Sequence, residues 1–297
     1  MTSSPKPPAE GRPAQTPLAS TVAGASGAST HSASSAAPDA VAPAHAAHPL
    51  YSGLRAGLVE LGLHLSDAQM AQLLAYVDWL AKWNRVYNLT ALRDPAEMLT
   101  HHLLDSLAAV APLRRQLAKR AAAQLQPGAD AGALIEGEAQ ALRPADVPTW
   151  RLLDVGSGGG LPGVVIAIAC PDVAVWCVDT VAKKALFIEQ VAAALRLPNL
   201  HGVHARVEQL RDHYDVVCSR AFASLPDFVQ WSRRALRPGG EGQPAGVWMA
   251  MKGRHPADEL AALPHDIAVF HVEQLAVPGL NAERCIVWMQ PKALQTP

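Results

Sequence analysis

The chain has 297 residues and a formal net charge of −1, with 25 Lys and Arg residues against 26 Asp and Glu residues. This length allows one or two domains, and the near-neutral charge excludes a global attraction to nucleic acid, so any such contact has to come from local patches. No apolar run reaches the roughly 18 residues of a membrane span, and the 4 scattered cysteines, none in Cys-x-x-Cys spacing, are typical of buried thiols rather than of disulfides or zinc ligands.

Residues 1–48 are predicted to be a disordered tail. They consist almost entirely of Ala, Ser, Pro, Thr and Gly, and a segment with so few large apolar side chains cannot bury enough surface to offset its ordering entropy. The segment does not have the basic start and apolar core of a secretory signal. A transit peptide would contain more arginine than Arg12 alone.

Residues 50–118 predict a helical subdomain packed beside a sheet domain. Apolar side chains recur at every third or fourth position in its first half, which is the period of a helix with one buried face. Ser66 and Gln69 have the spacing of a capping box. Residues 94–97, Asp-Pro-Ala-Glu, form a second helix start with proline at the first helical position.

Residues 119–149 are rich in Ala, Gly, Gln and Pro without a clear period, which predicts an inserted linker or loop with at most one short helix. The sheet domain follows over residues 150–292, and residues 241–245 lengthen one of its turns. Strands are predicted near 152–155, 174–178, 200–204, 214–219, 246–251, 267–272 and 285–289. Helices are predicted at 181–196, 226–237 and 256–262.

The first strand of this domain leads into a glycine-rich turn. Residues 152–155 form an apolar run, as expected of a strand buried on both faces of a parallel sheet. Gly156, Gly158 and Gly160 follow at once, and a short buried helix opens at Leu161. Glycine lets the backbone approach a ligand where a Cβ would collide. This unit predicts an α/β fold with a doubly wound, Rossmann-like and mostly parallel sheet.

The second strand ends on Asp179, 19 positions after Gly160. A carboxylate there can accept hydrogen bonds from both ribose hydroxyls of a nucleoside cofactor, although a structural turn with a helix-capping Asp179 is the alternative. The dinucleotide fingerprint would require glycine where Leu161 stands. The observed Gly-x-Gly-x-Gly spacing, opened by Asp154, resembles the loop of class I S-adenosylmethionine-dependent methyltransferases, as does Leu-Arg-Pro-Gly-Gly at 236–240.

Several short strings occur in an order that resembles one family of this class. They are Asn88-Leu89-Thr90, residues 102–107, residues 154–163, Ser-Arg-Ala-Phe-Ala at 219–223 and Lys252-Gly253. The chain resembles the glucose-inhibited-division B family of bacterial 16S ribosomal RNA guanine-N7 methyltransferases over about residues 50–292, apart from the two insertions. The resemblance implies S-adenosyl-L-methionine as cofactor and 16S ribosomal RNA or the small ribosomal subunit as partner. We expect a cytoplasmic monomer that needs neither a metal nor a membrane.

The resemblance also implies cofactor contacts on the glycine loop, after the third strand and at the end of the fourth: Gly156, Leu161, Val207, Glu208 and Arg220. Of these, Val207 and Glu208 are implied to lie beside the adenine. The pattern of residues adds Gly158 and Asp179.

Guanine N7 carries a lone pair and no proton, so its methylation needs no general base and we expect no catalytic acid or base. Positioning and desolvation supply the rate. We hypothesise that Arg220 and Lys252, both predicted at the carboxyl ends of strands, frame the target guanosine and its phosphates. The alternatives are a salt bridge of Arg220 to an acidic neighbour such as Glu208 and a plain surface position for Lys252.

Other side chains are further candidates. We expect one residue of the pair His101-His102 to be in the core and the other exposed. Arg284 matches a basic family position of unclear role. Two basic clusters could face RNA or could simply be solvated: Arg114, Arg115, Lys119 and Arg120, and Arg233, Arg234 and Arg237. Lys183-Lys184 is expected on an exposed helix face. Aromatic side chains at helical spacing, Trp79, Trp83 and Tyr87, could stack on bases but are more often core.

Three other functions remain open from the residues alone. A methyltransferase of the same fold acting on a small molecule is compatible with the neutral net charge. A nicotinamide-dependent oxidoreductase is disfavoured by Leu161 at the third fingerprint position. A non-catalytic RNA-binding module is disfavoured by the intact glycine loop.

Overall fold

The computed structural model describes residues 44–125, 150–240 and 244–292. Seven strands form one sheet in the order β3-β2-β1-β4-β5-β7-β6. The pairs from β3 to β5 are parallel, and β7 runs antiparallel to both β5 and β6. The prediction of an α/β fold with a mostly parallel sheet is confirmed. The strands are β1 Trp150–Val155, β2 Val173–Asp179, β3 Leu200–His204, β4 Val216–Arg220, β5 Val247–Lys252, β6 Ile267–Gln274 and β7 Cys285–Pro291.

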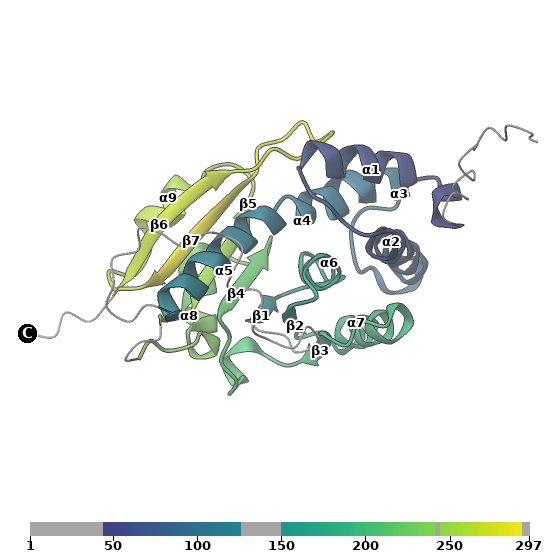
Figure 1. Ribbon diagram of the computed structural model, residues 1–297. Coiled ribbons are helices and arrows are strands. Elements are labelled where there is room, and N and C mark those ends of the chain that lie inside the picture. Colours follow the sequence, from purple (N-terminus) through teal and green to yellow (C-terminus); the bar gives the residue numbers. More distant parts are fainter. Residues whose placement is uncertain (1–43, 126–149, 241–243, 293–297) are drawn as a thin grey trace, which may run out of the picture. The chain divides into compact units, whose positions relative to one another are not determined.

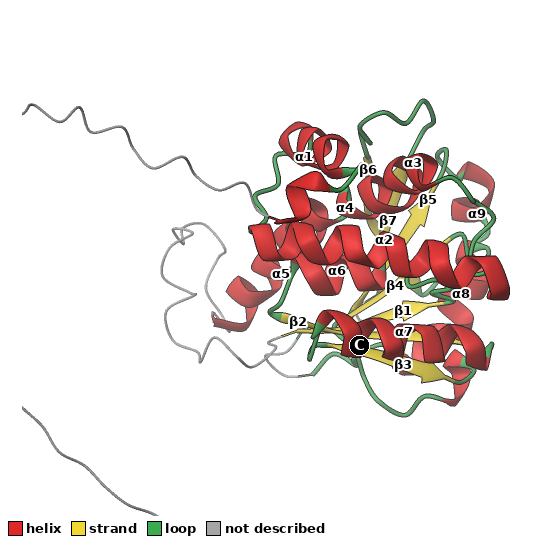
Figure 2. Cartoon of the chain, turned by 90° about the vertical axis from the view of Figure 1, so that its right-hand side faces the viewer, coloured by secondary structure: helices red, strands yellow, loops and turns green. Residues whose placement is uncertain are grey.

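Helices cover both faces of the sheet. The α-helices are α1 Tyr51–Glu60, α2 Asp67–Tyr87, α3 Pro95–Met98, α4 Asp105–Leu107, α5 Val110–Leu125, α6 Gly163–Ala169, α7 Ala182–Leu195, α8 Leu225–Ser232 and α9 Ala257–Ala261. Short 3-10 turns lie at Ala44–Ala47, Val207–Gln209 and Arg233–Ala235, and Leu99–Leu104 is π-helical. Helix α2 lies beside α6 and α7 (Figures 1 and 2).

Successive side chains along a strand belong to two different apolar clusters, one on each face of the sheet. Leu152 joins the cluster that also contains buried residues of α1 to α7, whereas Leu153 joins the cluster under α8. This alternation follows from the two-residue period of a strand. Because the helices of residues 50–118 share the first cluster with the sheet, they complete one core rather than form a separate one. The 4 cysteines are free and buried, as predicted.

The predicted helix starts are confirmed. Ser66 and Gln69 form a reciprocal capping box at the start of α2. The Asp94 side chain accepts a hydrogen bond from the backbone N–H of Ala96, with Pro95 as the first residue of α3. Each cap satisfies backbone N–H groups that have no partner within the helix.

Helical structure extends across two of the predicted boundaries. Residues 44–47 of the expected tail form a 3-10 turn, and the neighbouring His48 lies 3.3 Å from Asp78 of α2. Helix α5 continues through residues 119–125, which were assigned to the linker, because its alanine-rich end has high helix propensity. The rest of the predicted tail and linker, and residues 241–243 of the turn insertion, lie outside the described residues.

Candidate functional site

Two neighbouring cavities open at the carboxyl ends of the parallel strands. The first, of about 430 Å³, lies over the ends of β1, β4 and β5. The second, of about 410 Å³, lies over the ends of β1 and β2 and the turn after β3. Gly156 and Ala221 line both cavities. In open α/β sheets, ligands bind at this edge where the strand order reverses, which here is at β1.

The glycine loop lies between the two cavities, and its residue Gly156 lines both of them. Gly156, Gly158 and Gly160 have φ angles of 68°, 58° and 91°, a region that other residues rarely adopt. A Cβ placed on Gly156 would collide with the ring of Phe222. The loop therefore requires glycine at Gly156 for both its backbone conformation and the space around it.

Two buried side chains form hydrogen bonds with this loop and with the start of α6. Asp154 is fully buried and accepts a hydrogen bond from the N–H of Gly163 at 2.8 Å. Burial raises the pKa of the Asp154 carboxyl to about 7. The hydroxyl of Tyr76, on α2, donates to the carbonyl of Gly159 at 2.6 Å. The helical region thus contacts the loop directly.

The second cavity brings together four of the predicted cofactor residues: Gly156, Asp179, Val207 and Glu208. The Asp179 carboxylate accepts hydrogen bonds from the N–H groups of Gly158 and Val181 and lies 3.3 Å from the Lys184 ammonium. Asp179 therefore both lines the cavity and caps the following turn.

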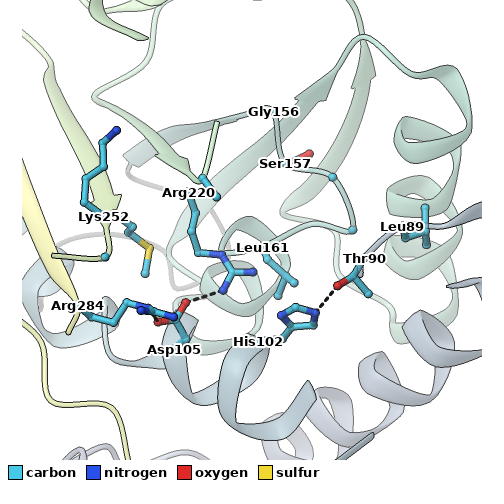
Figure 3. Close-up of a pocket in the computed structure, with 15 residues that line it drawn as sticks. Leu89, Thr90, His102, Asp105, Gly156, Ser157, Leu161, Arg220, Lys252 and Arg284 are labelled. Atoms are coloured by element: carbon cyan, nitrogen blue, oxygen red, sulfur yellow. Dashed lines mark hydrogen bonds and ion pairs between the residues drawn. The ribbon is translucent and has the colours of Figure 1, made fainter. Parts of the chain in front are cut away.

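The first cavity collects the other predicted residues, Gly158, Leu161, Arg220 and Lys252, together with Gly156. Arg220, at the end of β4, pairs with Asp105 through an N–O distance of 2.5 Å and donates to the carbonyl of His101. Arg220 therefore forms the salt bridge given as the alternative, but its acidic partner is Asp105 and not the suggested Glu208. Arg284 also pairs with Asp105, its Nε lying 2.8 Å from the other carboxylate oxygen (Figure 3).

His102 and Thr90 form another polar pair on the wall of this cavity. The His102 Nε2 lies 2.7 Å from the Thr90 hydroxyl oxygen. Burial, assisted by the nearby Arg220 charge, lowers the pKa of His102 to about 4, so the imidazole is neutral at neutral pH. His102 is buried and His101 is exposed, which confirms the expectation for this pair.

Lys252 lines the first cavity, but its ammonium group is engaged elsewhere. It donates to the carbonyl of Ala223 at 2.9 Å and pairs with Glu259 at 2.7 Å. Figure 3 shows the side chain directed away from Asp105. Lys252 thereby braces the segment that follows Arg220.

The two predicted basic clusters do not line either cavity, and most of their members are paired. Arg114 lies 3.4 Å from Asp172 and Arg115 lies 2.6 Å from Glu273. Arg120 is buried, with a hydrogen bond to the carbonyl of Pro244. Arg233 and Arg237 pair with Asp266 and Asp215, while Lys119 and Arg234 are exposed.

The aromatic candidates on α2 belong mainly to its packing surface. The rings of Trp83 and Phe187 lie 5.4 Å apart, which places Trp83 against α7. Tyr87 is 41% exposed, and the Lys183 ammonium lies over its ring at 5.2 Å. Trp79 is partly buried against the first apolar cluster.

Thr90, His102 and Asp105 line the first cavity, but no role for them was predicted from the sequence. All three lie in strings that carried the family resemblance, which was the available signal. Asp105 follows the π-helical segment Leu99–Leu104, and π-helices are rare and often occur at functional sites. Within the described ranges, no group of three or more His, Cys, Asp or Glu side chains could hold a metal ion, and no helix could span a membrane.

Comparison with known proteins gives consistent matches. A family model described as GidB, rRNA small subunit methyltransferase G, matches residues 69–122 and 139–287. A protein named ribosomal RNA small subunit methyltransferase G from Acidovorax sp. (strain JS42) is 61% identical over 240 residues, covering 81% of this chain and 95% of that protein. The protein of the same name from Polaromonas naphthalenivorans (strain CJ2) is 60% identical over 242 residues, covering 82% of this chain and 96% of the relative.

Among solved structures, TrmN from Thermus thermophilus is similar with a TM-score of 0.38 and 20% identity, over 48% of this chain and 44% of that chain. The fold assignment therefore rests on the sheet topology described above.

Proposed function

Because this chain belongs to the GidB family of small-subunit ribosomal RNA methyltransferases, we propose that it transfers the methyl group of S-adenosylmethionine to N7 of a guanine in 16S ribosomal RNA. The observation that carries the proposal is the high identity over 95% of the length of a relative, combined with a glycine loop between two cavities. The family favours neither a small-molecule methyltransferase nor a nicotinamide-dependent enzyme. Because ribosomal RNA is its proposed substrate, we expect the protein to act in the cytoplasm. We also expect it to be a monomer.

The residues around the glycine loop fit the cofactor. The second cavity offers Asp179 and Glu208 as acceptors for hydroxyl and amino groups, beside the apolar Val207. At Gly158, which lines the first cavity, nothing lies closer than 3.8 Å to a Cβ built on the backbone, so the loop leaves open space on that side. We propose that the second cavity holds the adenosyl part of the cofactor and that Gly156, Leu161 and Arg220 hold the remainder. The cofactor supplies a methyl group on a sulfonium.

The side chains of the site position the reactants rather than move protons. N7 has no proton to lose, so no base is required. The neutral His102 is paired with Thr90, and the Asp105 carboxylate is occupied by two guanidinium groups. We propose that Arg220 frames the target guanosine from its side of the cavity. Lys252 supports Arg220 indirectly by holding the carbonyl of Ala223.

The test is methylation of small ribosomal subunits taken from a bacterial strain that lacks the family enzyme. The purified full chain and labelled S-adenosylmethionine should produce 7-methylguanosine in 16S ribosomal RNA, detected by nucleoside mass spectrometry. Gly156→Ala is the matched control, because the added Cβ would collide with Phe222 and strain the loop. Labelling of a different base, or no labelling of RNA by the wild-type chain, would refute the proposal.

A further inference from the structure

Asp105 lies at the centre of an arrangement that methyl transfer by itself does not explain. Its side chain is only 3% exposed, and each of its two oxygens meets a different arginine: Arg220 at 2.5 Å and Arg284 at 2.8 Å. A buried carboxylate with two charged donors fixes both guanidinium groups in place. The two arginines come from opposite sides of β5, because Arg220 ends β4 and Arg284 precedes β7.

The charges on the wall of the first cavity do not cancel. Lys252 is neutralised by Glu259 at 2.7 Å, and His102 is uncharged at neutral pH. Arg220 and Arg284 therefore share the single carboxylate of Asp105, which leaves one excess positive charge on a cavity of about 430 Å³. An excess cation in a partly buried site favours an anionic ligand.

Both arginines also keep donors that the rest of the described chain does not use. The Nη1 group of Arg220 donates to Asp105 and to the carbonyl of His101, whereas its Nε and Nη2 groups have no partner among the described residues. The Nε group of Arg284 donates to Asp105 and its Nη1 group donates to the carbonyl of Glu283, so that Nη2 has no partner within the described ranges. The arginine side chains are 17% and 24% exposed, and both line the cavity (Figure 3).

The place of Arg284 indicates which anion it meets. The second cavity lies over β1 and β2, whereas β7 is separated from β1 by β4 and β5. Arg284 is thus on the side of the first cavity away from the proposed adenosyl site. We propose that Asp105 is a positioning residue that presents Arg284, beside Arg220, to a backbone phosphate of the RNA strand at the target nucleotide. This inference rests on the proposed function, since that function supplies the RNA strand.

The test measures RNA binding separately from methylation. Filter binding of a 16S ribosomal RNA fragment, at several salt concentrations, is compared for the wild-type chain, Arg284→Ala, Arg284→Lys and the matched control Arg254→Ala. Arg254 is an exposed arginine in the loop after β5. We expect Arg284→Ala to weaken RNA binding about tenfold and to reduce the slope of log affinity against log salt by about one.

A structural role would not change the salt slope, so that readout separates the two explanations. Arg284→Lys keeps the charge and should restore the slope and part of the affinity. S-adenosylhomocysteine binding to Arg284→Ala, measured by calorimetry, should match the wild type. Asp105→Asn should weaken RNA binding as Arg284→Ala does, and the double variant should be no weaker than Asp105→Asn alone.

Three results would overturn the inference. One is an unchanged salt slope in Arg284→Ala. Another is weakened S-adenosylhomocysteine binding with unchanged RNA binding, which would assign the arginine to the carboxylate of the cofactor. A third is an equal loss of RNA binding in Arg254→Ala. If the wild-type chain binds RNA without methylating it, the proposed function fails, but the binding comparison still decides the role of Arg284.

Discussion

At the scale of single residues, the buried carboxylate of Asp154 makes the stability of the fold depend on pH. Burial raises its pKa from 3.8 to about 7 in the folded protein. Between these values the folded protein binds a proton that the unfolded chain has released. The free energy of unfolding therefore falls as the pH rises through this window and becomes level above it.

We expect Asp154→Asn to remove this dependence. The amide oxygen can still accept the hydrogen bond from the N–H of Gly163, which the wild-type carboxylate accepts at 2.8 Å, but the amide does not titrate. When the pH is raised from about 5 to about 8, the free energy of unfolding of the wild type should fall by on the order of a few kcal/mol more than that of the variant. Urea unfolding at both pH values measures this difference. Parallel pH profiles of the two proteins would contradict it.

Some features of the site could be predicted from the sequence, whereas contacts between distant parts of the chain could not. The position of Gly156, Gly158 and Asp179 beside the cavities could be predicted because it depends on spacing within one strand-turn-helix unit. The partner of Arg220 could not, because Asp105 lies 115 positions away in the chain and only the packing of the helical region on the sheet brings the two together. The direction of the Lys252 ammonium likewise depends on Glu259 and on the carbonyl of Ala223.

At the scale of elements, α2 and the glycine loop are joined by a single buried hydrogen bond. We expect Tyr76→Phe to cost about 1–3 kcal/mol, because the carbonyl of Gly159 loses its 2.6 Å donor in a buried position. The loop should also hold its ligand less firmly, which calorimetry with S-adenosylhomocysteine would detect as a higher Kd.

Tyr87→Phe is the matched control for this prediction. Tyr87 lies on the same helix, its ring is 41% exposed, and its hydroxyl has no hydrogen-bond partner in the part of the chain that the structure describes. Chemical unfolding of the control should agree with the wild type. Equal stability of the wild type and Tyr76→Phe would show that the hydrogen bond does not fix the loop.

Most elements could be predicted because hydrophobic periodicity reports burial directly. The strand predicted at residues 200–204 has the observed bounds of β3, and the start of α2 follows from the capping box. The π-helical segment Leu99–Leu104 could not be predicted, because one extra residue in a turn leaves no mark on the apolar pattern. The end of α5 was missed because its alanines carry propensity but little periodicity.

At the scale of the whole molecule, one continuous apolar cluster joins residues of α1 to α7 with residues of the central strands. Residues 1–48 were predicted to lie outside this fold. The Acidovorax relative is covered over 95% of its length by 81% of this chain, so the family fold needs only part of it. The composition of residues 1–48 predicts a disordered tail, but His45 and His48 contact Asp67 and Asp78 of α2 at 3.9 Å and 3.3 Å.

Two truncations test whether residues 1–43 or the contacts of His45 and His48 stabilise the fold. Removal of residues 1–43 should leave the thermal midpoint and the methylation rate unchanged, since it spares both histidines. Removal of residues 1–48 deletes two partly exposed pairs worth at most about 1 kcal/mol each, which corresponds to a fall of roughly 2–4 °C per kcal/mol in a fold of this size. Scanning calorimetry of both variants measures the difference. A fall in the midpoint after the shorter truncation would show that residues 1–43 stabilise the fold despite their composition.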